Sequence, residues 1–556
     1  MQDTLNAPRN ISENPLLRRR LFLYLTEFFS GVSVMAVELG ASRLLAPYFS
    51  SSQIVWTIII GMIMISMAVG NLWGGHVADK RPEPALLYRR ILISALWFAA
   101  IPFAGKYVIL AVSGVLVFTV NTGLLIAAAF ISCLLLFVFP LFLLGTVTPS
   151  LVKYTVGSLD DSGRVVGRLG ACNTAGSILG TFLPTFVTIP AWGTAVTFLL
   201  FSGLLLIIAV IFFLAEKKKR AAVVSIVAAA FYLLCIVLGA ASSPAFWKSD
   251  KVYEGESIYN YLLVQEDRRS ITLSTNVLFG VQSVTMKDPG LTGMYYDYAL
   301  AAPAIAAADK GSDAGLDILI LGGGTCTYGG LCLDYFPGSH IESVEIDAKI
   351  TALASAYFGM PEEIEVTEYD GRAYLQAVKN EYDVILVDAY QDITIPFQMS
   401  TVEFFTLVRE HLREGGVLAV NMNMRTGGEG SISEALCDTI AKVFPYVSTV
   451  DVNGNTNRIL LASADRPPEE ALPEALESSR FPGGEDDELG VFLANTAYRL
   501  NPYAGGDAIL TDDRAPVELL GMRAIDSIIE DELAYYKAVM KDEGFAGLLR
   551  ALGIGG

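Results

Sequence analysis

Asp317-Ile-Leu-Ile-Leu-Gly-Gly-Gly-Thr325 is the stretch that decides the fold of the C-terminal half of this chain. Its apolar run has the length and composition of a buried strand, and three glycines follow it directly. In a doubly wound α/β sheet, such a glycine loop makes room for a nucleotide. Ser343-Val-Glu-Ile-Asp347 follows one βα unit later and places Glu345 at the end of a second strand. An acid at that place is within reach of ribose hydroxyls, so the sequence predicts a nucleoside-binding domain.

Strand and helix patterns alternate around the glycine loop. Beyond it, the sequence predicts strands over residues 341–346, 364–368, 383–388 and 416–422, and helices over 348–357 and 400–413. Before it, short strands fit residues 261–264, 271–274 and 281–286. Residues 466–490, rich in Pro, Glu and Gly, are predicted to be a surface loop. A βαβ series implies a parallel sheet with helices on both faces, so we expect an α/β domain over residues 303–556 behind a small β subdomain over 250–302.

Residues 21–243 are almost continuously apolar, which raises the mean hydropathy of the whole chain to +0.47. Runs of about 20 apolar residues are long enough to cross a bilayer. Such runs occupy residues 21–47, 54–78, 86–104, 121–151, 168–190, 194–215 and 221–241. Residues 105–119 form a shorter piece that is interfacial, re-entrant or an extra crossing. We therefore predict a basic tail over residues 1–20 and a multi-pass α-helical membrane domain of about seven or eight helices over 21–243.

Basic clusters set the expected orientation of these helices. They lie at residues 18–20, 80–90, 153–168 and 217–220. Seven crossings put all four clusters and the N-terminus in the cytoplasm, with the C-terminal domain on the other side. An extra crossing through 105–119 brings that domain into the cytoplasm but places the later basic clusters outside it. The side of the membrane on which the C-terminal domain lies therefore stays open. Four polar or charged residues lie within the apolar runs: Glu27, Glu38, Arg43 and Asn173. They indicate either a path for a cationic solute or a structural Glu38–Arg43 pair.

Charge and composition exclude some functions. The net charge of −19 argues against nucleic acid as a partner, because phosphate binding needs clustered Lys and Arg. It fits a cationic small substrate, or simply a soluble domain surface. Six cysteines and three histidines show no metal-ligand spacing and no disulfide pattern, so we expect no metal site.

The order of the C-terminal motifs resembles the spermidine synthase (polyamine aminopropyltransferase) family in its membrane-fused bacterial form. Glu38-Leu-Gly-Ala-Ser-Arg43-Leu-Leu-Ala-Pro47 and Leu510-Thr-Asp-Asp-Arg-Ala-Pro-Val-Glu518 are similar to the same fused group. The resemblance implies a Rossmann-like domain of the class I S-adenosylmethionine type. It also implies a membrane-bound enzyme that moves an aminopropyl group from decarboxylated S-adenosylmethionine to an amine and releases methylthioadenosine. No prosthetic group is expected, and soluble relatives make a homodimer plausible.

The resemblance assigns a donor pocket residue by residue. Gln282 matches a glutamine that lines the thioadenosine pocket, and Gly322, Gly323 and Gly324 match the loop beneath the donor sulfur. Glu345 matches the ribose ligand. Asp370 and Gly371, within Tyr369-Asp-Gly-Arg372, match a motif whose Asp takes the adenine amino group. Taken alone, Glu345 and Asp370 could equally be strand-end acids that cap the next helix.

The acceptor side carries the predicted catalytic acids. Asp388 matches the first acid of the family's catalytic loop and is our first choice as the base that takes the amine proton. Asp392 and Asp297 are further candidates, and Asp392 would need a loop shift to act. Tyr295 and Tyr296 are expected to form walls of the amine pocket.

Three departures from the family pattern leave the reaction open. Thr325 stands where the family has an Asp that holds an ammonium, Gln391 replaces the second acid of the catalytic loop, and Tyr295-Tyr296-Asp297 replaces Tyr-His-Glu. Loss of the acid at Thr325 suits S-adenosylmethionine itself, because its carboxylate would be repelled by an Asp. The alternatives are therefore an intramolecular lyase that gives methylthioadenosine, a methyltransferase, or, in another class, a non-catalytic nucleoside-binding transporter or sensor.

Overall fold

The computed structural model describes residues 14–49, 52–118, 120, 123–156, 162–277, 280–310, 315–389, 395–423, 428, 430–454, 456–478 and 487–551. The chain divides into two compact units. The helical unit comprises Met1–Val120, Leu124–Lys248 and Gly255–Tyr261, and the mixed unit comprises Asn121–Gly123, Ser249–Glu254 and Leu262–Gly556.

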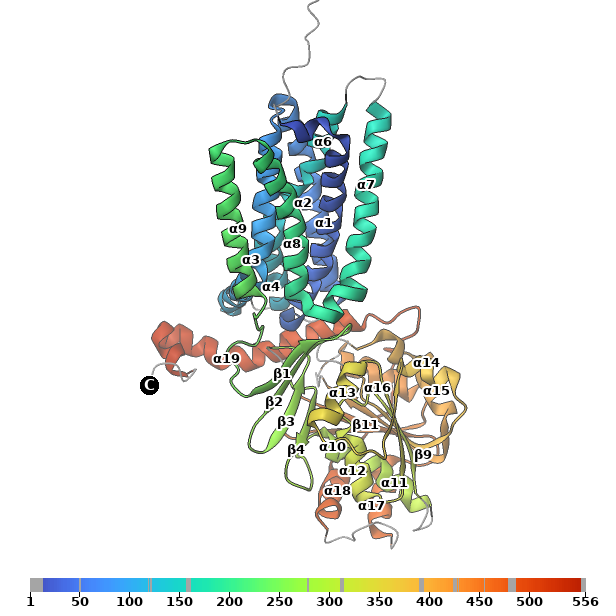
Figure 1. The fold of residues 1–556 in the computed structure, drawn as a ribbon. Helices are drawn as coiled ribbons and strands as arrows, with labels where there is room; N and C mark the ends of the chain where they lie inside the picture. The colour runs from blue at the N-terminus through green and yellow to red at the C-terminus, as the bar shows by residue number, and fades with distance from the viewer. Residues whose placement is uncertain are drawn as a thin grey trace, which may run out of the picture. The chain divides into compact units, whose positions relative to one another are not determined.

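Long apolar helices build the first unit (Figure 1). They are α1 (Arg20–Phe49), α2 (Gln53–Lys80), α3 (Pro84–Val117), α4 (Leu124–Cys133), α5 (Phe139–Gly145), α6 (Val147–Thr155), α7 (Ser162–Leu183), α8 (Ile189–Ala215) and α9 (Lys219–Gly239). Short π-helical turns, Leu134–Val138 and Pro184–Thr188, join α4 to α5 and α7 to α8. By length and composition, six stretches of the described chain could cross a membrane. Residues 105–117 continue α3, so this piece is neither a separate crossing nor a re-entrant segment.

The longest of these stretches, Ser162–Ala215, is broken at Gly193. The φ of this residue is 81°, a value that a right-handed α-helix does not allow. A new helical segment starts there, and its first amide, Thr194 N, donates to Glu256 Oε1 at 3.2 Å. Thr194 Oγ1 donates to Glu256 Oε2 at 2.5 Å. A carboxylate at a helix N-terminus satisfies unpaired amides and complements the helix dipole. The break therefore separates two helices, which agrees with the separate runs predicted over 168–190 and 194–215.

Helices α1 and α7 pack closely through glycines. A Cβ at Gly176 would lie 2.1 Å from the carbonyl oxygen of Phe28, so only glycine permits this approach. Beside this contact, the buried Glu27 accepts hydrogen bonds from Thr148 Oγ1 (2.6 Å) and Asn173 Nδ2 (3.0 Å). Glu27 therefore ties α1 to α6 and α7.

Two sheets build the mixed unit. A four-stranded sheet in the order β1-β2-β3-β4 contains β1 (Lys251–Glu256), β2 (Tyr261–Glu266), β3 (Ser270–Ser274) and β4 (Ser283–Met286). The eight-stranded sheet has the order β12-β10-β11-β9-β8-β5-β6-β7. Its strands are β5 (Asp317–Leu321), β6 (His340–Glu345), β7 (Glu365–Glu368), β8 (Tyr382–Val387), β9 (Leu412–Met422), β10 (Tyr446–Asp451), β11 (Arg458–Ser463) and β12 (Asn501–Pro502).

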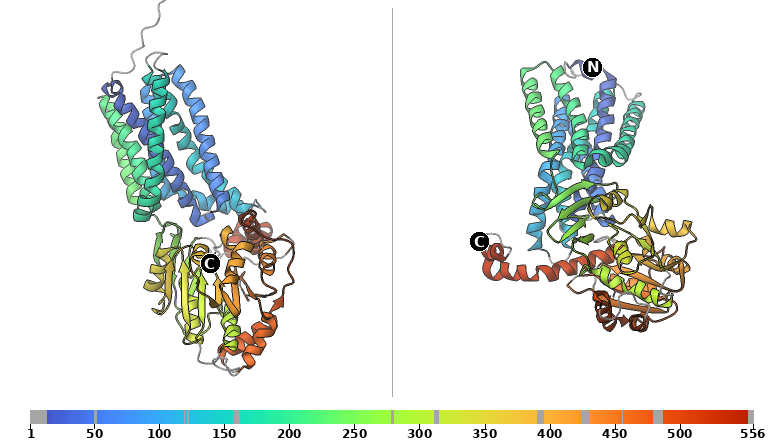
Figure 2. Two further views of the ribbon diagram at one scale, coloured as in Figure 1. Left: turned by 90° about the vertical axis from the view of Figure 1, so that its right-hand side faces the viewer. Right: turned by 60° about the horizontal axis from the view of Figure 1, so that its bottom comes forward.

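Helices cover both faces of the large sheet (Figure 2). One face packs against α10 (Tyr295–Ala299), α11 (Ala301–Asp309), α12 (Thr327–Tyr335), α17 (Pro468–Glu477) and α18 (Glu488–Arg499). Ile318 and Ile320 point into this core, whereas the alternate residues Leu319 and Leu321 are buried outside it, as the two-residue period of a strand requires. The remaining helices are α13 (Ala348–Tyr357), α14 (Gly371–Ala377), α15 (Val402–Glu410), α16 (Ile432–Ala441) and α19 (Val517–Ala551).

The topology confirms the predicted strands from β2 to β9 to within a few residues. Strands β5 to β9 run parallel, and β9, β11, β10 and β12 are joined by antiparallel pairing. The prediction of a loop over 466–490 is wrong for Pro468–Glu477, which forms α17. Its buried Ala471, Leu472, Ala475 and Leu476 recur at helical spacing, a signal that the high Pro and Glu content of the segment obscured.

Candidate active site

The site lies where the order of the parallel strands reverses. Strands β6 and β7 extend the sheet on one side of β5, and β8 lies on the other side. Such a switch point leaves a crevice beyond the carboxyl ends of the two diverging strands. The glycine loop follows β5 and Asp388 follows β8, so the fold brings these two predicted elements together.

The glycine loop is packed too closely for side chains. Gly322 has a φ of 89°, and a Cβ there would lie 2.6 Å from the Cα of Ala389, the residue after Asp388. A Cβ at Gly323 would lie 1.8 Å from Ser343 Oγ on β6. The backbone of the loop therefore passes directly between the ends of β6 and β8, and only glycine fits at these two positions.

A cavity of about 120 Å³ opens at this place. Its described lining residues come from β3, β4, the glycine loop, β6, α13, α14, the residues directly after β8 and the segment before α15. They include the predicted Gln282, Gly322, Gly324, Glu345, Asp370, Gly371 and Asp388. Residues predicted separately for the ribose, the adenine and the base thus share one cavity.

Glu345 is held at the edge of the cavity by the glycine loop. Its Oε2 accepts a hydrogen bond from Gly324 N at 2.9 Å, and its Oε1 accepts from Asp347 N at 3.0 Å. Burial raises the pKa of Glu345, while these amide hydrogen bonds oppose the rise. Each carboxylate oxygen keeps a second lone pair, so Glu345 can accept hydroxyl groups of a sugar without leaving its place.

Asp370 serves as a helix cap and also lines the cavity. Its Oδ1 accepts from Ala373 N at 2.9 Å, which satisfies one amide of the first turn of α14. The capping interpretation is therefore confirmed, and it leaves the other carboxylate oxygen for a ligand.

Asp388, which directly follows β8, accepts a hydrogen bond on each of its carboxylate oxygens. Tyr295 OH donates to Oδ2 at 2.6 Å, and Asn421 Nδ2, from β9, donates to Oδ1 at 2.7 Å. Asn457 Nδ2 donates to Asn421 Oδ1 at 2.8 Å, which fixes the direction in which the Asn421 amide points. Burial raises the pKa of Asp388 to about 7, helped by the charge of Glu345, and the two hydrogen bonds oppose that rise. A carboxyl group that titrates near neutrality is suited to act as a general base.

The structure separates the three residues predicted on α10. Tyr295 reaches Asp388, whereas Tyr296 is buried and its hydroxyl accepts from Val284 N at 3.4 Å. Asp297 is fully buried and accepts from Thr292 N and Thr292 Oγ1 on one oxygen and from Gly293 N on the other. Asp297 therefore holds the turn before α10, and it is not among the described residues that line the cavity.

Thr325 takes part in a chain of hydroxyls instead of an acidic pocket. Its Oγ1 lies 3.0 Å from Thr327 Oγ1, which lies 2.7 Å from Thr285 Oγ1 on β4. Thr325 is 2% exposed and is absent from the described lining of the cavity. Gln391 and Asp392 lie outside the described residues.

Sequence reasoning missed the support for the loops around the cavity. Arg372 makes a two-pronged ion pair with Asp512 (both contacts 2.7 Å) and donates to the carbonyl oxygen of Gln398 at 3.0 Å. Thr401 Oγ1 also donates to Asp512 at 2.7 Å. The late segment that carries Asp512 therefore clamps the start of α14 to the cavity-lining segment at Gln398.

Replacing Asp512 with Asn should raise KM for the donor several-fold and leave kcat almost unchanged. The variant loses the charged partner that fixes Arg372, while Asp388 and the glycine loop are untouched. Because the pair is partly exposed, the free energy of unfolding should change by no more than about 1 kcal/mol. Steady-state kinetics at varied donor concentration measure the effect, and Asp513→Asn, at the exposed neighbouring position, is the matched control. Equal KM values for the two variants would show that the clamp does not shape the pocket.

Comparisons with known proteins identify relatives of this chain. The sequence model of the Spermine/spermidine synthase domain matches residues 306–453. A probable polyamine aminopropyl transferase of Bifidobacterium longum is 54% identical over 320 residues, which cover 55% of this chain and 70% of that protein. A polyamine aminopropyltransferase of Vibrio vulnificus is 26% identical over 288 residues, which cover 49% of this chain and 92% of that protein. A probable spermidine synthase structure from Corynebacterium glutamicum aligns with 46% of this chain and 95% of its own, at 21% identity and a TM-score of 0.35.

The match to the Bifidobacterium protein spans more than two thirds of its length at more than half identity. The domain match falls on the strands that form the switch point, from α11 to the turn after β10. The membership favours an enzyme over a non-catalytic transporter or sensor. This chain belongs to the spermine/spermidine synthase family of polyamine aminopropyltransferases and is a transferase.

Proposed function

We propose that this chain transfers an aminopropyl group from decarboxylated S-adenosylmethionine, the co-substrate of its family, to an amine, with Asp388 as the base. The observation that carries the proposal is the place of Asp388. It faces the same cavity as the glycine loop and Glu345, and its pKa is raised to about 7.

The reaction is an in-line displacement at the carbon next to the sulfonium. Asp388 takes a proton from the substrate ammonium, and the lone pair of the resulting neutral amine forms the new N–C bond while the C–S bond breaks with its electron pair going to sulfur. Sulfur becomes the neutral thioether of methylthioadenosine, and the product leaves as a secondary ammonium. Tyr295 and Asn421 hold the carboxylate so that a free lone pair can meet the amine. Positioning of the amine and donor supplies much of the remaining acceleration.

The activity should fall as the pH drops through about 7. Because the folded-state pKa of Asp388 is raised, the carboxylate form is present above about pH 7 and is lost below it. We expect kcat/KM to decline about tenfold per pH unit on the acid side. Asn421→Ala removes a hydrogen bond that stabilises the carboxylate, so its acid limb should move to higher pH.

The amine substrate titrates as well, but its pKa does not respond to a change at Asn421. An acid limb that stays in place in the Asn421→Ala variant would therefore assign the titration to the substrate and not to Asp388. Asn495→Ala, at an exposed position on α18, controls for a general effect of losing an asparagine.

A second candidate donor is S-adenosylmethionine itself. The observation in its favour is Thr325, whose neutral hydroxyl chain with Thr327 and Thr285 replaces the acid expected in the family. In this reading the donor's own carboxylate attacks and releases methylthioadenosine, or a methyl group is transferred.

Release of methylthioadenosine distinguishes the two donors. Purified full-length protein would receive either donor, with and without putrescine, and the nucleoside would be measured by chromatography. Our proposal predicts release only from the decarboxylated donor and only with the amine. Release from S-adenosylmethionine without an amine would replace the proposal with the lyase reaction.

We further propose that the helical unit anchors the enzyme in the cell membrane as a multi-pass domain. Six stretches have the length and composition for this, and the break at Gly193 splits the longest of them. The basic clusters favour a cytoplasmic N-terminus. Resistance of the protein to extraction from membranes by alkaline carbonate tests the anchoring, and its release into the supernatant would contradict it.

A further inference from the structure

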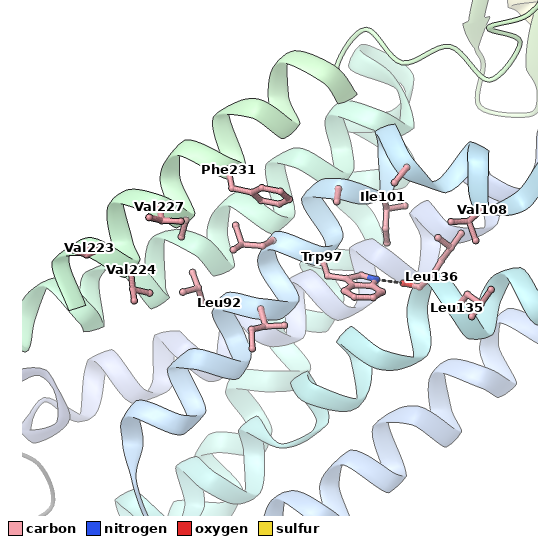
Figure 3. Close-up of a pocket in the computed structure, with 15 residues that line it drawn as sticks. Leu92, Trp97, Ile101, Val108, Leu135, Leu136, Val223, Val224, Val227 and Phe231 are labelled. Atoms are coloured by element: carbon pink, nitrogen blue, oxygen red, sulfur yellow. Dashed lines mark hydrogen bonds between the residues drawn. The ribbon is translucent and has the colours of Figure 1, made fainter. Parts of the chain in front are cut away.

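The helical unit carries an apolar groove of about 740 Å³ that takes no part in the proposed reaction. Fifteen of the described residues line it, from α3, the π-helical turn Leu134–Val138 and α9 (Figure 3). All of them are Ala, Val, Leu, Ile, Phe or Trp. The indole Nε1 of Trp97 donates to the carbonyl oxygen of Leu136 at 2.9 Å, so this polar group of the wall is already paired. The groove therefore presents hydrocarbon along its length.

Small side chains hollow out the groove between two helices. Ala100 and Ala104 lie one turn apart on α3, and Ala228 lies on α9. Beyond Phe231, α9 comes close to α3. A Cβ at Gly239 would lie only 3.3 Å from Pro102 Cβ. A space that narrows between two helices suits a single flexible chain better than a flat helix face.

The groove is long enough to hold the hydrocarbon of one leaflet of a bilayer. Its lining runs from Leu92 to Val108 on α3, which is about 24 Å of helix, and from Val223 to Phe231 on α9, which is about 12 Å. Half of a bilayer's hydrocarbon core is about 15 Å thick. One acyl chain of a lipid in one leaflet therefore fits along it.

Positive charge gathers at one end of the groove. Lys217, Lys218, Lys219 and Arg220 are all exposed and directly precede the groove lining of α9. Arg89 is exposed one turn before Leu92, which lies at the same end of the groove as Val223 (Figure 3). Basic residues next to a hydrocarbon surface attract anionic lipid headgroups.

We propose that the groove binds one acyl chain of an anionic phospholipid, whose headgroup phosphate meets the cluster Lys217–Arg220. This inference rests on the proposed insertion of the helical unit in a membrane. The proposed lipid-binding site lies in the helical unit and takes no part in aminopropyl transfer.

Quenching of Trp97 by brominated lipids tests the proposal, because Trp97 is part of the wall and 39% exposed. A variant that keeps Trp97 and has Phe at the other four tryptophans would be reconstituted in phosphatidylcholine bilayers. These would contain rising fractions of either acyl-dibrominated phosphatidylglycerol or acyl-dibrominated phosphatidylcholine. The reference variant keeps Trp192 alone, which is 58% exposed and lies outside the groove lining.

Half-maximal quenching of Trp97 should need about fivefold less brominated phosphatidylglycerol than brominated phosphatidylcholine, the preference that one basic residue near the surface supplies. Trp192 should show no such preference. The triple variant Lys218→Glu, Lys219→Glu, Arg220→Glu should abolish the preference of Trp97, and Ala104→Phe should reduce its quenching by either lipid by filling the groove.

Equal responses of Trp97 to both lipids would overturn the proposal while leaving membrane insertion intact. Absence of quenching at both Trp97 and Trp192 would overturn it together with the insertion. Neither outcome would affect the assignment of Asp388, which is measured separately through methylthioadenosine release.

Discussion

Replacing Asp388 with Asn is expected to lower kcat for aminopropyl transfer by about 10²- to 10⁴-fold, the range that a positioned general base contributes. Asparagine keeps the size of the side chain and can still accept from Tyr295, but it cannot take a proton from the attacking amine. Donor binding should change little, because Glu345 and the glycine loop remain in place. Rapid-mixing kinetics with saturating donor and amine measure the loss.

Asp297→Asn is the matched control for this experiment. Both acids lie near α10, but the carboxylate of Asp297 is occupied by the turn at Thr292 and Gly293. This variant should lose stability and keep the kcat of its folded fraction. A variant Asp388→Asn that retains more than a tenth of the kcat would show that another group is the base.

Replacing Gly322 with Ala is the second large expected effect. The new Cβ would meet the backbone of Asp388 and Ala389 at distances of 2.6–2.8 Å, and a φ of 89° is itself unfavourable for alanine. Backbone cannot rotate away as a side chain can, so the ends of β5 and β8 must move apart. We expect a loss of about 2–4 kcal/mol in the free energy of unfolding and a loss of activity larger than the loss of folded protein.

Gly338→Ala separates the clash from the backbone strain. Gly338 has a nearly identical φ of 82°, and nothing lies within 4 Å of its Cβ position. Its replacement should cost only the strain, about 1–2 kcal/mol, and leave kcat unchanged. Denaturant unfolding followed by circular dichroism gives the change in stability, and steady-state kinetics give kcat. Similar losses in the two variants would mean that the contact between the glycine loop and β8 is unimportant.

The convergence of the predicted donor-side residues on one cavity has a physical reason that the sequence already carries. Buried strands are short apolar runs, and in a parallel sheet their carboxyl ends meet at one edge. Gly322 and Asp388 each follow such a run, Glu345 ends β6 and Asp370 follows β7, so their convergence on one cavity could be expected before any side chain was placed.

The support of Asp388 could not be predicted in the same way. Asn421 lies at the end of β9 and Asn457 just before β11, and they meet because β9 and β11 pair antiparallel. Such a pairing depends on strand register, which no local pattern fixes. The clamp of Arg372 by Asp512 joins residues 140 positions apart, so no local sequence pattern predicts it either.

Asp297 shows the limit of a motif match. Three neighbouring residues of α10 were assigned to the acceptor side together, but successive helical positions point about 100° apart. Tyr295 therefore reaches Asp388, whereas Asp297 holds the turn before α10. The helical unit shows a similar limit, since the apolar piece predicted over 105–119 gave no sign that residues 105–117 continue α3 without a break.

The most direct test of the central claim is mass spectrometry of the amine after incubation of the full chain with decarboxylated S-adenosylmethionine and putrescine. The proposal predicts an amine heavier by one aminopropyl group, formed in equal amount with methylthioadenosine, and almost none with the Asp388→Asn variant. An unmodified amine in the presence of released methylthioadenosine would contradict aminopropyl transfer.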